Sequence, residues 1–488
     1  MAGIGIELKR IFRKDSLVSV LSGAAYSTLV VIGPTVIVMA ALLLMYGTLG
    51  YMNVNYAERE LLSATILYVF IFALLVTAPV NAVMSRYIAD KIFEETYEDI
   101  LPSFCTGLAL CEMGGAALGI PFAVHLVVVG NVEVLFVILS YLFFMELITV
   151  FYAMTYLTAT KDYKITAMDF VAGMLVTILS ALCAHKLLGS PILYAILGGL
   201  CLGFFLIAVL QTAYIRHYFA FSNRNYGGCL SYFVRMKRLF FGTLFYSLGI
   251  YVHNFIFWGA RGHLVTAESY YCNQAYDMAS CLGMFTNISA MVIFTVMAES
   301  SFHDMYQTYN EAVIGAALKD IEIAQKNMFH LLIRQMGYVI RVQAIISMIL
   351  FLLVRIFLPD YGFSGLEMTI YPGLAAAYFC IFIMYCNIIY LYYFNDSTGT
   401  FLTGLIFLLG TLLGSLVTKG LQPQYYGLGA LFGGLLGWTF SYFRIWYLER
   451  HIDHHIMCSM HLIKENKVCD REVVWKKALR EDSREEGK

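Results

Sequence analysis

The stretch LLSATILYVFIFALLVTAPVNAVMS, residues 61–85, decides the fold class because none of its 25 residues is charged. An α-helix rises about 1.5 Å per residue, so about 20 apolar residues cross the hydrocarbon core of a bilayer. The run is long enough and apolar enough to do so. It therefore predicts a transmembrane helix.

Similar runs lie on both sides of this one, and together they predict about twelve transmembrane helices. The predicted spans are residues 20–46, 61–85, 104–130, 134–158, 165–186, 192–216, 239–260, 276–299, 331–358, 369–394, 400–419 and 425–447. Composition agrees, because 60% of the chain is hydrophobic and 13% is charged, whereas soluble domains are about a quarter charged. We expect an all-α polytopic membrane protein.

The distribution of Lys and Arg predicts the orientation of these helices. If both termini are cytoplasmic, about 27 of the 32 Lys and Arg residues fall on inner segments, as the positive-inside rule requires. We therefore expect a multi-pass protein of the cytoplasmic (inner) membrane with both termini in the cytoplasm. The first apolar run continues for about 30 residues, which is too long for a cleaved signal peptide.

The predicted spans divide into two groups of six around a polar midpoint. We expect a cytoplasmic amphipathic helix at 1–16, a six-helix bundle at 17–216, a linker at 217–238, a second six-helix bundle at 239–447 and a cytoplasmic tail at 448–488. Residues 300–330 have the pattern of an amphipathic helix that lies along the membrane surface. No internal sequence repeat is evident.

Motifs of soluble enzymes are missing from the sequence. There is no Walker loop, no G-x-G-x-x-G and no H-E-x-x-H, so we expect neither catalysis nor direct use of ATP by this chain. The eleven cysteines have no C-x-x-C spacing and are interpreted as small apolar residues. The group His451, His454, His455, Cys458 and His461 has helical spacing, but a juxtamembrane helix is the favoured interpretation. We expect no metal and no cofactor.

Ionisable residues inside membrane spans are unfavourable unless they face water, protein or a substrate. The candidates for a cavity or substrate path are Glu112, Glu146, Asp169, His253, Asp277, Glu299 and Arg341. The competing interpretation is structural: some pair helices together, and those near a helix end extend to the membrane interface. We expect Arg341 to face protein or water and to be a partner for these acids.

Four stretches carry a resemblance to a known family. They are MAGIGIELKRI at 1–11, SRYIADKIF at 85–93, LGIYVHNFIFW at 248–258 and ESSFHDMY at 299–306. Together they resemble the PelG family, the membrane transporters of Pel exopolysaccharide systems. The matches are ordered and spread over about 300 residues.

The resemblance implies a fold of the multidrug/oligosaccharidyl-lipid/polysaccharide (MOP) exporter superfamily, with two six-helix bundles around a central cavity. It implies export of an amino-sugar polymer rich in N-acetylgalactosamine and galactosamine. The implied partners are a cytoplasmic glycosyltransferase (PelF) and other membrane subunits of a Pel-type synthase (PelD and PelE). We then expect residues 217–238 and 300–330 to offer that synthase a cytoplasmic platform.

Three alternatives stay open at this point. An ion-coupled multidrug or lipid-linked oligosaccharide exporter of the same superfamily would need a compact acidic site within one bundle, whereas the acids here are scattered. A membrane-embedded glycosyltransferase would need a catalytic loop larger than any in this chain. A non-transporting scaffold of a polysaccharide synthase is the third alternative.

Overall fold

The computed structural model describes residues 17–160, 162–223, 225–260, 262–361, 365–452 and 455, and it describes their side chains except at 17–32, 163, 299 and 300. The amphipathic helix predicted at 1–16 and most of the predicted tail lie outside the described residues. Among the candidate residues, Glu299 is described for its backbone alone.

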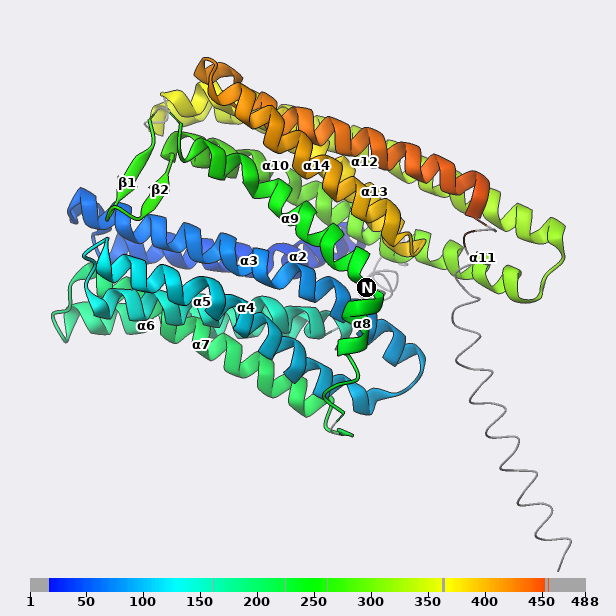
Figure 1. Ribbon diagram of the computed structural model, residues 1–488, viewed down its shortest axis with the longest axis horizontal. Coiled ribbons are helices and arrows are strands. Elements are labelled where there is room, and N and C mark those ends of the chain that lie inside the picture. Colours follow the sequence, from blue (N-terminus) through cyan, green and yellow to red (C-terminus); the bar gives the residue numbers. More distant parts are fainter. Residues whose placement is uncertain are drawn as a thin grey trace, which may run out of the picture.

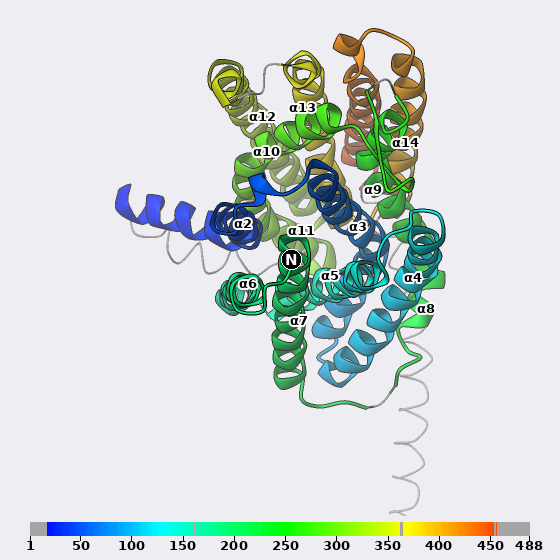
Figure 2. The same ribbon diagram turned by 90° about the vertical axis from the view of Figure 1, so that its left-hand side faces the viewer.

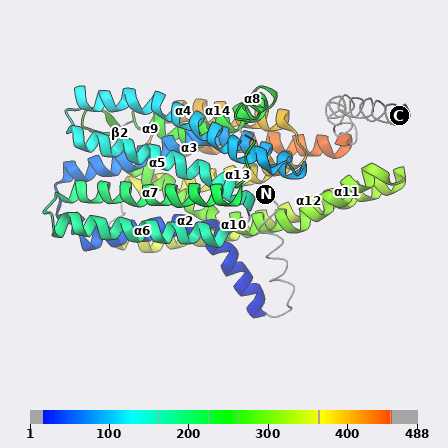
Figure 3. The ribbon, with the colours of Figure 1, turned by 90° about the horizontal axis from the view of Figure 1, so that it is seen from below.

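Six long helices form the first half of the molecule. They are α2 (Leu17–Thr48), α3 (Tyr56–Phe93), α4 (Ile100–Val128), α5 (Val134–Thr160), α6 (Tyr163–Lys186) and α7 (Ile192–Tyr218), with short 3-10 turns η1 (Tyr51–Asn53) and η2 (Tyr97–Asp99) between them. Helix α5 packs against α3, α4 and α7, while α6 packs against α2 and α7. Helix α2 contains Pro34 and bends away from its neighbours (Figure 3), as expected for proline within a helix.

The second half has six long helices as well. They are α9 (Lys237–Phe257), α10 (Gln274–Met297), α12 (Leu318–Phe357), α13 (Leu366–Tyr393), α14 (Ser397–Lys419) and a helix over residues 428–452. The shorter elements are α8 (Leu230–Arg235), β1 (Leu264–Thr266), β2 (Tyr270–Cys272), the π-helical turn η3 (Ala298–Phe302), α11 (His303–Gly315), η4 (Leu358–Tyr361) and η5 (Pro423–Tyr425). Strands β1 and β2 form an antiparallel hairpin, which pairs Leu264 with Cys272.

The two halves lie side by side and meet mainly through α3 against α9 and α2 against α10. In Figure 2, α10, α12, α13 and α14 lie on one side of the molecule and α4 to α7 on the other. The β-hairpin marks one end of the helices and α11 the opposite end (Figure 1). We call these the hairpin end and the linker end, because residues 219–236 also lie beside the latter.

The membrane fold is confirmed. Within the described residues, ten helices are long and apolar enough to cross a membrane. With α2 and the helix over residues 428–452, they correspond one for one to the twelve predicted spans. The chain is an all-α polytopic membrane protein.

The predicted surface helix at 300–330 is wrong in form. Helix α11 ends at Gly315, the backbone at Ala316 and Ala317 is extended, and α12 then runs without a break from Leu318 to Phe357. Its 40 residues measure about 60 Å, twice the thickness of the hydrocarbon core. The first part of α12 therefore projects beyond the membrane and pairs with α11 in a helical hairpin (Figures 1 and 3). The apolar face of this segment packs α11 against α12.

Small residues bring the last two helices of each half into close contact. Between α6 and α7, a Cβ atom added to Gly203 would lie 2.6 Å from the carbonyl oxygen of Gly173. Between α14 and the helix over 428–452, a Cβ added to Gly414 would lie 2.9 Å from the carbonyl oxygen of Gly429. Such small-residue seams allow helix backbones to approach in membranes. They occupy the same position in both halves, although no sequence repeat is evident.

Candidate functional site

The second half contains a buried polar network around His253 of α9. The Tyr276 hydroxyl lies 2.9 Å from His253 Nδ1, and the Tyr378 hydroxyl lies 3.5 Å from Nε2. Tyr378 also lies 2.7 Å from the hydroxyl of Ser280. Helices α9, α10 and α13 each contribute to this network, and His253 itself is fully buried. His253 therefore joins three helices inside the second half.

Asp277 of α10 belongs to a second part of the same network. Its carboxylate accepts hydrogen bonds from Asn254 Nδ2 at 2.7 Å, from Trp258 Nε1 at 3.0 Å and from the backbone N–H of Asn273 at 3.1 Å. Three neutral donors compensate a buried carboxylate without a cation. Ser280 joins the two parts by donating to Asn254 Oδ1 at 3.5 Å, so the candidate residues His253 and Asp277 lie in one network.

The first-half acids have fewer partners. Glu112 of α4 accepts a hydrogen bond of 2.6 Å from Thr149 on α5. Glu146, also on α5, has a buried Oε2 atom without a hydrogen-bond partner among the described residues. Buried polar atoms are normally satisfied. The Oε2 atom of Glu146 therefore needs a ligand, a water molecule or a proton.

Asp169 of α6 is nine-tenths buried, and its Oδ2 atom also has no partner among the described residues. Helices α6 and α7 run antiparallel, and Gly173 contacts Ile207 and Gly203. Asp169 lies one turn before Gly173 on α6, and Gln211 lies one turn after Ile207 on α7. The antiparallel packing therefore brings Asp169 and Gln211 to the same level. The amide of Gln211 is buried and unpartnered within the described chain.

Arg341 pairs with none of the candidate acids whose side chains the structure describes. Its Nε atom donates to the Gly337 carbonyl oxygen of its own helix at 3.0 Å, and the described residues contain no ion pair that includes it. Arg341 shares an exposed face of α12 with Tyr338 and Ile345. It lies 17 residues before Leu358, about 25 Å along the helix.

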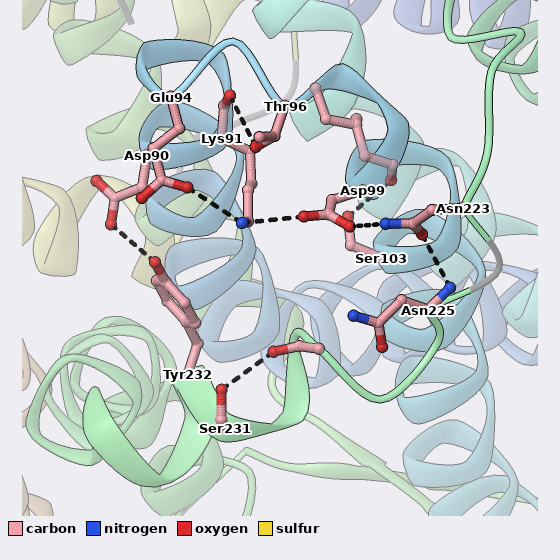
Figure 4. A network of polar contacts seen from close by, with 12 residues as sticks. Asp90, Lys91, Glu94, Thr96, Asp99, Ser103, Asn223, Asn225, Ser231 and Tyr232 are labelled. Atoms are coloured by element: carbon pink, nitrogen blue, oxygen red, sulfur yellow. Dashed lines mark hydrogen bonds and ion pairs between the residues drawn. The ribbon is translucent and has the colours of Figure 1, made fainter. Parts of the chain in front are cut away.

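A polar network at the linker end was not predicted from the sequence (Figure 4). Lys91, near the end of α3, forms ion pairs with Asp99 at 2.9 Å and with Glu94 at 3.1 Å. Asn223 of the linker donates to Asp99 from the other side, and the Tyr232 hydroxyl lies 3.3 Å from Asp90. These contacts fasten the linker to the loop between α3 and α4.

A second linker-end contact joins Asp396 to Arg444. The carboxylate of Asp396 is almost fully buried, accepts two hydrogen bonds from Arg444 at 2.5 and 3.0 Å, and caps α14 through the N–H of Gly399. This bidentate pair holds the α13–α14 loop against the helix over residues 428–452. Its role is structural, because both partners are satisfied.

The described residues contain no group of three or more His, Cys, Asp or Glu side chains that could hold a metal ion. Three members of the histidine-rich group, His454, Cys458 and His461, lie outside the described residues. What the site offers is a set of carboxylates and aromatic rings within helices. Carboxylates accept hydrogen bonds from cationic groups.

The family of the chain is decided by a match to a family model over residues 1–457. That model is PelG, described as "Putative exopolysaccharide Exporter (EPS-E)". The chain belongs to the PelG family. The predicted resemblance is confirmed, and the match covers both halves and the linker. No curated protein matches the sequence.

Solved structures with the same fold are transporters. An outward-facing multidrug resistance MATE transporter of the MOP superfamily matches with a TM-score of 0.58 at 12% identity, covering 87% of this chain and 96% of that one. A variant of the Vibrio cholerae MATE transporter VcmN matches with a TM-score of 0.57 at 9% identity, covering 88% and 96%. A MOP superfamily transporter from Pyrococcus furiosus matches with a TM-score of 0.58 at 13% identity, again covering 88% and 96%.

These findings establish the fold and the broad function of this PelG family member. It has the MOP exporter fold, spans the cell membrane many times and transports polysaccharide across it. Family and fold are those of a transporter.

Proposed function

We propose that the chain exports a Pel-type amino-sugar polymer across the cytoplasmic membrane while a synthase makes it. Family membership over residues 1–457 carries this proposal. The two six-helix halves, 17–216 and 239–447, would move relative to each other around the path, with residues 217–238 as the linker between them. Transport of polymer into sealed vesicles tests the proposal directly.

A partly deacetylated amino-sugar polymer is cationic at neutral pH, so its path should present acids and aromatic rings. Glu146 and Asp169 support this idea, since each has a buried carboxylate oxygen without a partner among the described residues. Glu112 is held by Thr149 and Asp277 by three donors, which makes them weaker candidates. Glu299 and His253 complete the proposed set, with Arg341 at its edge.

We propose that the linker end faces the cytoplasm and receives the synthase. Its platform consists of residues 217–236 and of the hairpin that α11 forms with the start of α12. The network of Lys91, Asp99 and Asn223 holds the linker in place, while Phe221 and Ile314 are each 79% exposed. Exposed apolar side chains on an ordered surface outside the membrane suit a protein partner. The glycosyltransferase and the other membrane subunits of a Pel-type synthase are the proposed partners.

Cysteine labelling tests this orientation. Asn225→Cys in the linker and Asn310→Cys in α11 should resist a membrane-impermeant thiol reagent applied to intact cells and react after lysis. Gln424→Cys, exposed at the hairpin end, is the matched control and should react from outside. The reverse pattern would invert the topology and remove the proposed platform.

A further inference from the structure

The β-hairpin lies between the two halves of the molecule. It connects α9 to α10 in the second half, but its strands lie against α3 of the first half (Figure 1), and Ser269 in its turn contacts His125 of α4. Hydrogen bonds between residues more than 200 positions apart hold it there. Neither the family match nor the fold comparison assigns a role to this segment.

Glu60 and Thr65 of α3 make the first set of contacts. The side-chain amide of Gln274, at the start of α10, lies 2.7 and 2.8 Å from the two carboxylate oxygens of Glu60. Thr65 donates to the Tyr270 hydroxyl at 3.2 Å. Glu60, Thr65 and Tyr270 are all buried, so these bonds are shielded from solvent.

Tyr68, one turn further along α3, makes the second set. Its hydroxyl donates to the Tyr271 carbonyl oxygen at 2.7 Å and accepts from the Tyr271 N–H at 3.0 Å. Tyr68 therefore binds both the carbonyl oxygen and the N–H of Tyr271, and these two bonds hold strand β2 against α3. The Tyr68 ring also stacks on Trp258, with centroids 4.6 Å apart, and Trp258 donates to Asp277. The contact between halves is thus tied to the network inside the second half.

Helix α4 and the loop after it contact the hairpin turn. His125 Nδ1 lies 3.0 Å from the Ser269 hydroxyl. A Cβ atom added to Gly130 would lie 3.0 Å from the same hydroxyl and 2.7 Å from the Ala267 carbonyl oxygen. The turn therefore fits closely against the first half on a second side.

The hairpin is held to the first half by these hydrogen bonds together with apolar packing of Tyr270 against Leu126 and Val137. Exchanging a hydrogen bond within the protein for one to water changes the free energy only modestly, so a polar contact between halves can open where a water-filled path replaces it. We propose that residues 267–271 and Gln274, with Glu60, Thr65, Tyr68 and His125, form a latch that closes the hairpin end of the polysaccharide path. The latch separates from the first half when polymer leaves.

This inference rests on the proposed transport function, and a reversible cross-link tests it. Gly130→Cys and Ser269→Cys, in a Cys272→Ser background, place one Cβ close to the other sulfur, as a disulfide requires. Oxidation holds the latch closed, so polymer export should fall by about tenfold or more, because the open population is removed. Reduction with dithiothreitol should restore export.

The matched control is a disulfide within the hairpin, between strands β1 and β2. Leu264→Cys can pair with native Cys272 across the two strands without linking the halves, and its export should not change on oxidation. Full export by the quantitatively cross-linked double variant, Gly130→Cys with Ser269→Cys, would overturn the latch. Absence of export by the reduced protein and by the unmodified chain would instead contradict the transport function, so the two failures are distinguishable.

Discussion

Replacement of Glu146 by glutamine is expected to lower polymer export by about tenfold, since a hydrogen bond to a charged group contributes roughly 1.5–3 kcal/mol and about 1.4 kcal/mol is a factor of ten. Glutamine keeps the size of the side chain and removes the charge. The buried Oε2 atom of Glu146 has no partner among the described residues, so the change breaks no described contact of that atom. Secreted polymer per unit of membrane-inserted protein is the quantity to measure.

Two comparisons sharpen this result. Glu112→Gln should have the smaller effect, because Thr149 already satisfies one Glu112 oxygen. Glu58→Gln, exposed at the hairpin end, should leave export unchanged. Wild-type secretion by both the Glu146 and Glu112 variants at normal expression would show that these acids do not line the path.

Replacement of Gly203 by leucine should destabilise the first half by about 3 kcal/mol, at the upper end of the usual cost of overpacking. The added side chain would meet the Thr177 hydroxyl and the Gly173 carbonyl oxygen. Helices α6 and α7 would have to separate. Thermal stability of the detergent-purified protein, followed by the loss of its monodisperse form, measures the change.

Gly198→Leu is the matched control on the same helix, because a Cβ at Gly198 meets nothing within 4 Å. Leucine favours helix more than glycine by up to about 1 kcal/mol, so this variant should be as stable as the unmodified chain or slightly more stable. An equal loss of stability in both variants would show that Gly203→Leu does not act through the close contact between α6 and α7.

The spans themselves could be predicted from the sequence, because lipid forces backbone hydrogen bonds into helices and long apolar runs follow. Two boundaries between neighbouring spans are marked by asparagine. Asn131 and Asn395 adopt positive φ angles of 48° and 55°, a conformation that asparagine tolerates, and each lies in the turn between two predicted spans. Hydropathy therefore located the twelve long helices that surround the candidate site.

The contacts between elements could not be predicted in the same way. Strands β1 and β2 have three residues each, too few for an alternating pattern, so the hairpin gave no signal. Glu60 and Gln274 are separated by more than 200 residues, and only the fold brings them together. The candidate acids were identified because a charged side chain is unfavourable in lipid. That argument shows that each acid needs a partner, but it does not identify the partner.

The same limit explains the surface helix at 300–330. Its apolar face is real, but periodicity alone cannot tell lipid from another helix. The extended residues Ala316 and Ala317 reverse the chain and are not turn-forming residues. Gly315 was the only local signal of this break.

The most direct measurement of the central claim is polymer transport into inverted membrane vesicles that contain this chain and a Pel-type synthase. Precursor nucleotide sugar is supplied outside, and polymer that resists an added glycosidase until detergent opens the vesicles is counted as transported. Protected polymer should form with this chain and not in vesicles that hold the synthase alone. Equal polymer synthesis in both preparations, with no protected fraction when the chain is present, would contradict the account.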